Sequence, residues 1–374
     1  MQRAALGEQL VALLGELVAI PSTYPPGDTS RIARHCADFL SALGYSAEAR
    51  DGNAVARRGR GASLVFNAHA DTVDVGGRGA WKTDPFKATV VDGKVYGLGA
   101  CNCKSAMAVH LWLAREIAQR GGPKKGEVVF TFVGDEENLG PNGLLKLRES
   151  GAVKPATLVV AAQTRNRLVL EERGVMWVRV TTRGKAAHAG APHTGDSAVL
   201  RMHDLVSALR ADLVPAIAKR KSATGQQSTL SIGRIRGGEN INVVPDLCTI
   251  EIDRRILPEE DFDGALAELK SAAMKAGATE VELLTGTPGF KAPENGAGVR
   301  AFSEAVRSVT GKAPEPLNVV GASDARYFAR DGIEILVTGP GDGADSHKPN
   351  EFVPLEELID AALIHLAAAE RLLF

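Results

Sequence analysis

Apolar residues recur along this chain at two spacings, and segments with the two spacings alternate. Leu10, Leu13 and Leu17 recur every three or four residues and predict a first helix, and a similar pattern at 32–40 predicts a second. Short apolar runs bounded by turn residues predict strands instead. In all, the patterns predict further helices at 104–120, 143–149 and 355–373, and strands at 63–68, 88–96, 127–134 and 157–161.

The stretch 88–96 is interrupted by Asp92-Gly93, a pair typical of a tight hairpin turn. The other strands alternate with helices along this part of the chain. Because parallel strands are joined by crossovers that are usually helices, this alternation favours an α/β fold with a largely parallel sheet.

From Gly174 the pattern changes. Residues 175–182 alternate between apolar and polar positions like a half-exposed strand. Predicted helices at 197–209 and 262–276 and strands at 229–235 and 247–257 follow, in the β-α-β-β-α-β order of a ferredoxin-like unit. The earlier alternation then resumes. We therefore expect a larger domain of residues 1–173 and 287–374, interrupted by a smaller inserted domain of residues 174–286.

Composition excludes several classes of protein. Lys and Arg number 44 against 45 Asp and Glu, so the chain lacks the basic surplus of a nucleic-acid binder. No apolar run reaches the ~18 residues of a membrane span, and residues 1–20 do not resemble a signal peptide. The 4 cysteines are too few and too irregularly spaced for a disulfide framework. We expect a soluble, cytoplasmic protein that binds neither nucleic acid nor membrane.

Three segments carry residues suited to metal chemistry. His69-Ala70-Asp71 ends the first buried strand, where residues two apart face the same side. The imidazole could bind a metal ion with the carboxylate orienting it, or the two could form an ordinary hydrogen-bonded loop pair. The acids 135–137 come after a second buried strand. They could bind a cation, or they could form a solvated acidic turn. The third segment, 346–351, indicates little by itself.

Together these segments resemble, in order and spacing, the acetylornithine deacetylase, succinyl-diaminopimelate desuccinylase and glutamate carboxypeptidase family of metallohydrolases. The resemblance runs over nearly the whole chain. It implies a zinc-exopeptidase-like catalytic domain, with 174–286 as an inserted ferredoxin-like lid or dimerisation domain. It also implies a divalent metal, zinc first with manganese or cobalt as alternatives, a small substrate bearing a carboxylate, and a homodimer. Four further stretches support it: 81–86, 92–97, 184–190 and 237–245.

Five residues match the catalytic centre of that family position by position. His69 corresponds to a terminal metal ligand and Asp71 to the acid behind it. Glu136 corresponds to the general base that takes a proton from the attacking water. Glu137 and His347 correspond to two further metal ligands.

Three residues of the inserted domain match lid positions of the family. His188 resembles the histidine that reaches a partner subunit's active site and steadies the substrate carbonyl or its oxyanion. Asn242 and Arg255 match residues near the substrate carboxylate. The resemblance therefore implies that a complete site needs two subunits.

Asn102, in the stretch 97–105, stands where the family has an aspartate that bridges two metal ions. A carboxylate offers two anionic oxygens, whereas a carboxamide offers one neutral oxygen and a nitrogen that donates. The family's other terminal acid precedes Pro-Thr, and counting back from Gly174 places Ala162 there. A shift of one residue would place Gln163 there, and both alternatives are neutral.

These departures change the expected metal content. Two dications about 3.5 to 4 Å apart need anionic ligands to offset their repulsion. Among the matched ligands, only Glu137 supplies a formal charge. We therefore expect fewer than two tightly bound ions, with one ion on Glu137 and His347 completed by Asn102 or water. His69 would then have little to bind.

Other kinds of site are less well supported. Cys101 and Cys103 could supply thiolate ligands, but small and apolar residues occupy these positions in the family, so packing explains both. The glycine pair at 97–99 lacks the third glycine of a dinucleotide loop. No G-x-S-x-G motif indicates a nucleophilic serine.

Two functions remain. We predict a metal-dependent amidohydrolase, similar to acetylornithine deacetylase, that cleaves an N-acyl amino acid or a related small amide at a modified, mononuclear site. The presence of Asp71, Glu136 and His188 favours this function. The alternative is a family member that keeps the fold as a binding or assembly protein, which the missing ligands favour.

Overall fold

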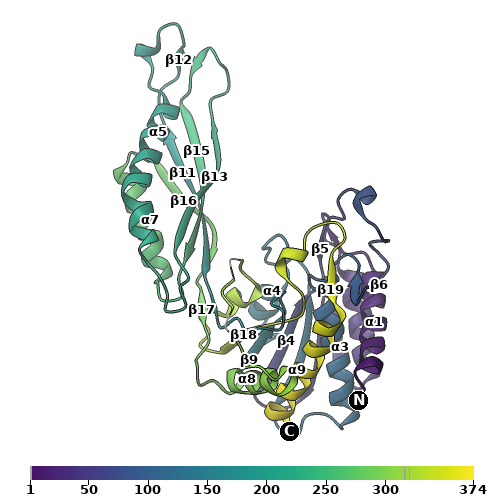
Figure 1. Cartoon of the computed structure of the whole chain (residues 1–374). Coiled ribbons are helices and arrows are strands. Elements are labelled where there is room, and N and C mark those ends of the chain that lie inside the picture. Colours follow the sequence, from purple (N-terminus) through teal and green to yellow (C-terminus); the bar gives the residue numbers. More distant parts are fainter. Residues whose placement is uncertain (1, 316, 320) are drawn as a thin grey trace. The chain divides into compact units, whose positions relative to one another are not determined.

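The structure is a computed structural model that describes residues 2–315, 317–319 and 321–374 (Figure 1). The chain forms two compact units. Unit 1 comprises residues 1–170, 292–317 and 323–374, and unit 2 comprises residues 171–291 and 318–322. The chain thus leaves unit 1 after residue 170 to build most of unit 2 and then returns.

Unit 1 is built on a six-stranded sheet. In spatial order the strands are β18 (Glu334–Val337), β9 (Thr157–Val160), β4 (Ser63–His69), β8 (Glu127–Val133), β3 (Asn53–Gly59) and β2 (Ser46–Arg50). The first four are parallel, whereas β3 and β2 run antiparallel to their neighbours. β4 and β8 are buried along almost their whole length, as expected of parallel strands in a covered sheet. The predicted α/β class is confirmed.

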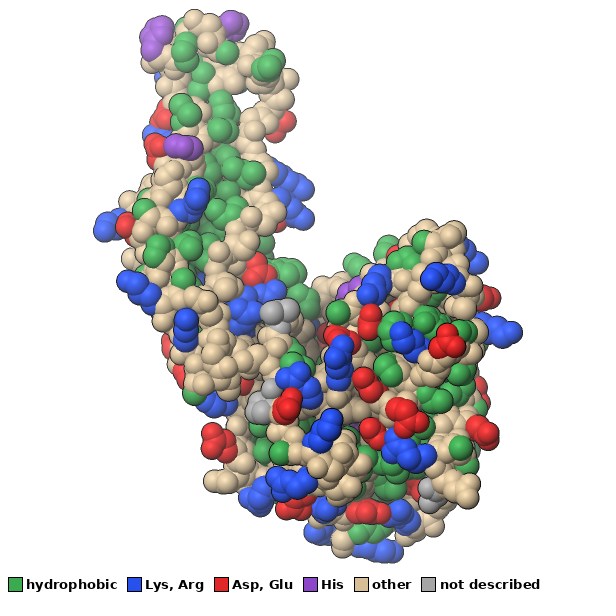
Figure 2. Space-filling model, viewed as in Figure 1, with side chains coloured by type: hydrophobic (Ala, Val, Ile, Leu, Met, Phe, Trp, Pro, Cys, Tyr) green, Lys and Arg blue, Asp and Glu red, His purple; other side chains and the backbone are tan. Residues whose placement is uncertain are grey.

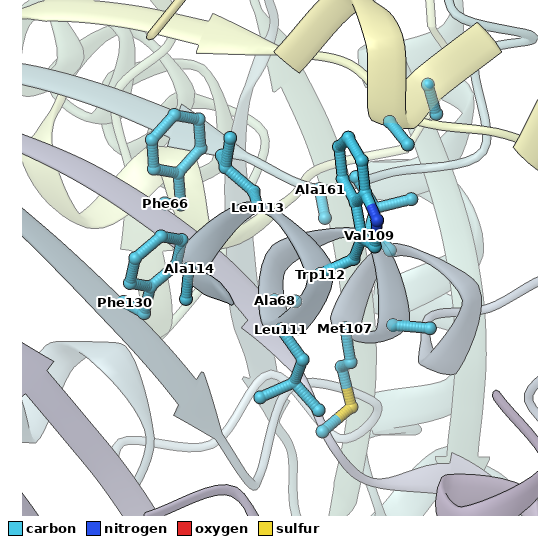
Figure 3. Packing of buried hydrophobic residues seen from close by; sticks show 14 of the residues in the cluster. Phe66, Ala68, Met107, Val109, Leu111, Trp112, Leu113, Ala114, Phe130 and Ala161 are labelled. Atoms are coloured by element: carbon cyan, nitrogen blue, oxygen red, sulfur yellow. The ribbon is translucent and has the colours of Figure 1, made fainter. Parts of the chain in front are cut away.

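α3 (Lys104–Gln119) is buried over most of its length and packs against α1 (Arg3–Val18), α2 (Ser30–Ala42) and α9 (Leu355–Leu373). The other helices of unit 1 are α4 (Leu144–Glu149) and α8 (Ala297–Thr310), and α8 packs against α9. Figure 3 shows Trp112 and Leu113 of α3 in one cluster with Phe66 of β4 and Phe130 of β8. The rings of Phe66 and Phe130 stack with their centroids 5.5 Å apart. This apolar layer fixes the strands whose ends carry the candidate residues.

A small sheet contains the predicted hairpin. β6 (Thr89–Val91) and β7 (Lys94–Tyr96) are joined by Asp92 and Gly93, whose φ angles of 48° and 72° suit a type I′ turn. β19 (Phe352–Pro354) pairs with β7. Other short elements of unit 1 are β1 (Thr23–Tyr24), β5 (Thr72–Val73), and the 3-10 turns η1 (Arg78–Ala80), η4 (Asp324–Phe328) and η5 (Gly343–Asp345).

Unit 2 contains a four-stranded antiparallel sheet with α5 (Ala198–Ala208) and α7 (Phe262–Lys275) packed against it. The strands, in spatial order, are β13 (Thr229–Gly237), β15 (Leu247–Ile256), β11 (Gly174–Arg183) and β16 (Glu280–Thr287). Along the chain the order is β-α-β-β-α-β, that of a ferredoxin-like unit. Short strand pairs are β12 (Ala187–His188) with β14 (Val243–Val244) and β10 (Glu171–Glu172) with β17 (Phe290–Lys291), and η2 spans Pro192–Thr194.

The helix predicted at 197–209 does not end there. It continues through a π-helical turn, η3 (Leu209–Leu213), into α6 (Val214–Ala218). The physical reason is that Leu213 and Ile217 remain buried at helical spacing, so the apolar face extends past the predicted end. Among the described residues, no helix is long and apolar enough to span a membrane.

Candidate functional site

The carboxyl ends of β4 and β8 bring the first candidate residues together. His69 ends β4 and is in register with Val133, the last residue of the parallel strand β8. The acids 135–137 follow directly, and Nε2 of His69 lies 3.8 Å from Oε2 of Glu136. Because neighbouring parallel strands end at one edge of a sheet, segments distant in sequence meet there.

Asp71 connects His69 to the acidic turn. Nδ1 of His69 lies 3.0 Å from the carbonyl oxygen of Asp71 and 3.4 Å from its Oδ1, while Oδ2 accepts a 3.0 Å hydrogen bond from the backbone N–H of Glu137. Burial raises the pKa of Asp71, but the hydrogen bond and charge of His69 outweigh it and lower that pKa. Burial lowers the pKa of His69, but the negative charge of Glu136 leads the effects that hold it well above its usual value.

The three acids after β8 have different surroundings. Asp135 has a left-handed φ of 67°, and its Oδ2 accepts hydrogen bonds from the backbone and side-chain nitrogens of Asn142 at 2.8 and 2.9 Å. Asp135 therefore caps the turn. Burial raises the pKa of Glu136, and the charges of Asp324 and Glu137 raise it further, against the opposing charge of the His69 ring. Glu136 is thus the acid best suited to proton transfer.

Asn102 is placed by a buried carboxylate that sequence reasoning did not single out. Glu351 accepts hydrogen bonds from the backbone N–H groups of Gly99, Cys101 and Asn102 at 3.1, 2.9 and 2.7 Å. Glu351 is 1% exposed, and burial raises its pKa against the effect of these hydrogen bonds. Glu351 belongs to the candidate segment 346–351, which was the one indication in the sequence that it could matter. No pattern of side chains shows that its hydrogen-bond partners are backbone groups.

The side chain of Asn102 contacts four others at the centre of the site. Oδ1 lies 2.8 Å from Nε2 of His69 and also accepts a hydrogen bond from Nε2 of Gln163. Nδ2 lies 2.8 Å from both Oε1 of Glu137 and Nε2 of His347. Those last two atoms are 3.0 Å apart. The hydrogen bond to Glu137 is the leading cause that raises the pKa of His347.

Of the two alternatives for the family's second acid, the structure brings Gln163 to the site. Its side chain reaches Asn102, whereas Ala162 has only a methyl group and offers no ligand atom. The chain therefore carries carboxamides where the resemblance implies two carboxylates.

The donor set fits one metal ion better than two. Oε1 of Glu137, Nε2 of His347 and the carboxamide of Asn102 lie 2.8 to 3.0 Å from one another, close to the spacing of ligand atoms around an ion with bonds of about 2.1 Å. His69, Glu136 and Glu137 also offer ligand atoms within 4.8 Å of one another. A second ion beside His69 would meet the carboxamides of Asn102 and Gln163, and of the two glutamates Glu137 already serves the first ion while Glu136 is the candidate base.

Cys101 and Cys103 are buried thiols rather than candidate thiolates. Burial raises the pKa of both, that of Cys103 to about 11. Sγ of Cys101 contacts the carbonyl oxygen of Asp342 at 3.3 Å. These contacts support the interpretation that both residues serve packing.

Unit 2 brings His188 and Asn242 close together. His188 lies in β12, is exposed, and accepts a 3.0 Å hydrogen bond at Nδ1 from the backbone N–H of Gly190. The carbonyl oxygen of Asn242 accepts a 3.0 Å hydrogen bond from the backbone N–H of Ala189. Figure 2 shows histidine side chains at the end of unit 2 that carries β12.

Arg255 lies elsewhere in unit 2. It is near the end of β15, whereas Asn242 precedes Leu247, the first residue of that strand. The eight residues from Leu247 to Arg255 correspond to about 26 Å along a strand. Its guanidinium pairs with the carboxylate of Asp253 at 2.7 Å. Within unit 2, the structure therefore does not bring Arg255 together with Asn242.

A buried network in η4 was not predicted. Asp324 and Arg326 are 3% and 6% exposed. Oδ2 of Asp324 accepts a 3.2 Å hydrogen bond from Asn67 in β4. Arg326 donates to the hydroxyl of Tyr327 at 2.7 Å, and that hydroxyl donates to the carbonyl oxygen of Gly140 at 2.9 Å. η4 therefore braces both β4 and the acidic turn, and its short, non-periodic sequence gives no pattern from which this follows.

A family model described as peptidase family M20/M25/M40 matches residues 65–371. The chain belongs to this family. The match extends over every segment of the site from His69 to His347. Membership of the M20 family confirms the predicted fold and the predicted class, a metal-dependent peptidase or deacylase.

Individual M20 relatives match the chain over nearly its full length. Acetylornithine deacetylase from Myxococcus xanthus is 29% identical over 375 residues, which cover 94% of each chain. Succinyl-diaminopimelate desuccinylase from Rhodospirillum centenum is 28% identical over 381 residues, 96% of each chain. The crystal structure of the M20 family metallo-carboxypeptidase Sso-CP2 from Sulfolobus solfataricus superposes with a TM-score of 0.80 at 17% identity, covering 96% of this chain and 98% of that one.

Proposed function

We propose that the chain is an amidohydrolase that cleaves the amide bond of an N-acyl amino acid or a related small amide. The observation that carries this proposal is the place of Glu136, whose side chain is 16% exposed, lies 3.8 Å from Nε2 of His69 and is adjacent in sequence to Glu137. A carboxyl group of raised pKa beside candidate metal ligands suits general-base hydrolysis. The names of the deacetylase and desuccinylase relatives support acyl amino acids as the substrate class.

Glu137 and His347 would hold one divalent ion, with Asn102 completing the set. Zinc suits this mixture of nitrogen and oxygen ligands, with manganese or cobalt as alternatives. When bound, the ion would polarise the amide carbonyl and make water at the site more acidic. Fewer than two ions are expected to bind tightly, because the neutral side chain of Asn102 cannot offset the repulsion between two dications.

Glu136 would act as the proton carrier of the reaction. As a carboxylate it would take a proton from the attacking water, and as a carboxylic acid it would pass that proton to the leaving amine. Burial favours the protonated form and the charge of His69 favours the carboxylate, so both forms are accessible. The Asp71 carboxylate would keep the acidic turn in place beside His69 through the backbone N–H of Glu137.

We infer that unit 2 joins two copies of the chain in a homodimer, in which His188 completes the partner's site. β13 is an edge strand of the sheet. Apolar side chains are exposed on β13 and α5: Ile235 is 62% exposed, Leu200 66% and Val199 37%. Figure 2 shows hydrophobic side chains along the length of unit 2. Exposed edges with apolar side chains favour pairing with a second copy.

A second candidate function is binding or assembly without hydrolysis. The observation that favours it is the hydrogen bonding of Asn102 and Gln163 to each other, where the family resemblance implies two carboxylates. Such a protein would keep the M20 fold and lose the chemistry.

Metal analysis and a hydrolysis assay on N-acetyl and N-succinyl amino acids separate the two functions. An amidohydrolase should show turnover that a chelator abolishes, that added zinc restores, and that the variant E136Q lacks. If the purified protein binds zinc but turns over no member of the panel, the binding function is the better description.

A further inference from the structure

Three atoms of the site cannot all be satisfied by hydrogen bonds as they stand. Nδ2 of Asn102 lies 2.8 Å from Oε1 of Glu137 and 2.8 Å from Nε2 of His347, and the last two atoms are 3.0 Å apart. If Nε2 of His347 carries a proton, it donates to Glu137 but repels the N–H of Asn102. If it carries a lone pair, it accepts from Asn102 but repels the carboxylate. One contact is therefore repulsive in either state.

The oxygen of the same carboxamide points the other way. Oδ1 of Asn102 lies 2.8 Å from Nε2 of His69 and accepts a hydrogen bond from Nε2 of Gln163. A half rotation exchanges the oxygen and nitrogen of a carboxamide with little change in shape. If Asn102 and Gln163 both rotate, the hydrogen bond between them survives with its direction reversed.

We propose that Asn102 and Gln163 rotate together when a metal ion binds, so that Oδ1 of Asn102 becomes a neutral third ligand beside Glu137 and His347. This inference rests on the single-ion site of the proposed function. Nδ2 of Asn102 then donates to Oε1 of Gln163, and the repulsive contact with His347 is removed. Gln163 is thus a positioning residue, because its acceptor oxygen holds the carboxamide in the orientation that binds the ion.

The rotation also changes what faces His69. Nδ1 of His69 lies 3.0 Å from the carbonyl oxygen of Asp71, which can only accept, so Nδ1 carries a proton. Nε2 of His69, which lies 2.8 Å from Oδ1 of Asn102, would face the N–H group of Asn102 after the rotation. The N–H groups of Asn102 face His69 and Gln163 in this state. They exclude a second cation from that side of the site.

Calorimetric titration of zinc into the metal-free, full-length protein tests this inference without an activity assay. Q163M keeps the side-chain length but removes the acceptor, and should weaken zinc binding about tenfold, the effect of one lost hydrogen bond. The carboxylate that Q163E introduces can only accept hydrogen bonds, so it holds Asn102 in the rotated orientation. Q163E should therefore tighten zinc binding about tenfold, still with one ion per chain. Q9M is the matched control, because Gln9 makes its side-chain hydrogen bonds to Trp112 and Arg115.

The zinc titrations distinguish a failure of the carboxamide rotation from a failure of the single-ion site. Equal zinc affinity in the native chain, Q163M and Q163E would overturn the inference and leave the single-ion site standing. A second bound ion in Q163E would also overturn it, since the introduced carboxylate would then be a ligand. If the native chain binds no zinc, the inference and the single-ion function both fail. Circular dichroism monitors folding, and Q163E, the smaller change, is decisive if Q163M does not fold.

Discussion

Oδ2 of Asp71 accepts a hydrogen bond of 3.0 Å from the backbone N–H of Glu137. The bond joins the segment after β4 to the turn after β8, and Asp71 is only 1% exposed. Because water cannot replace a partner at such a buried position, this one contact couples the orientation of His69 to the placement of both glutamates.

Removing the Asp71 carboxylate should destabilise the fold. D71A leaves the N–H of Glu137 buried without its acceptor, which typically costs about 1–3 kcal/mol in the free energy of unfolding. D71N keeps an acceptor oxygen and should lose less. Urea unfolding followed by circular dichroism measures both variants. Equal stability of D71A and the native chain would show that the hydrogen bond contributes nothing measurable.

Glu136 and Glu137 should separate chemistry from metal binding. E136Q should lower kcat by about 10² to 10⁴-fold, the usual contribution of a general base, with zinc content nearly unchanged. E137Q should release the ion instead, because it removes the one carboxylate of the proposed ligand set. Kinetics and metal analysis on the same samples test this. Equal loss of zinc in both variants would mean that the roles are assigned wrongly.

Restoring the two acids should restore a second ion. The double variant N102D/Q163E carries carboxylates at both positions where the resemblance implies them, and two anionic groups offset the repulsion between two dications. We expect two zinc ions per chain by mass spectrometry after dialysis, against one for the native chain. A double variant that still binds one ion would show that charge at these positions does not set the count.

Two buried histidines should make the fold sensitive to acid. The ring centroids of His110 and His365 lie 5.5 Å apart, among aromatic side chains. Neither ring nitrogen of His110 has a hydrogen-bond partner among the described residues. Burial lowers the pKa of His110 well below its usual value and that of His365 to about 4.

The unfolded chain therefore takes up protons below about pH 6.5 that the folded chain excludes. The contribution of these two histidines to stability should be complete above pH 6.5 and fall by about 1.4 kcal/mol per pH unit per histidine on acidification. H110F should reduce the slope of unfolding free energy against pH between 6 and 5, whereas H203Q, at an exposed position, should not. An unchanged slope in H110F contradicts this prediction.

Charges at the apolar edge of unit 2 should separate the two copies. L200E and I235E place carboxylates at exposed apolar positions of α5 and β13, where pairing with a second copy would bury them. We expect a monomer at micromolar concentration by light scattering, with hydrolysis lost because His188 no longer reaches a partner. H188A should instead remain a dimer with lowered kcat. A native chain that is a fully active monomer would refute the arrangement.

Much of the fold was predictable because it depends on local patterns. The apolar runs of β4 and β8 and the Asp92-Gly93 turn correspond to elements of the structure. The helix predicted at 197–209 corresponds to α5, but the π-helical turn and α6 that follow it were not predicted, because they depend on the burial of Ile217 in the tertiary structure. Local pattern alone cannot show which side chains a sheet will cover.

By itself, the sequence determined the α/β class, the inserted ferredoxin-like segment, and the residue types that meet at the site, because periodicity and short motifs are properties of neighbouring residues. The tertiary structure alone decided that Gln163 faces Asn102, that Glu351 binds three backbone N–H groups, and that η4 braces the acidic turn. Those contacts join distant segments, often through backbone groups that every residue shares. Such groups leave no signature in the order of side chains, so only the folded chain specifies their partners.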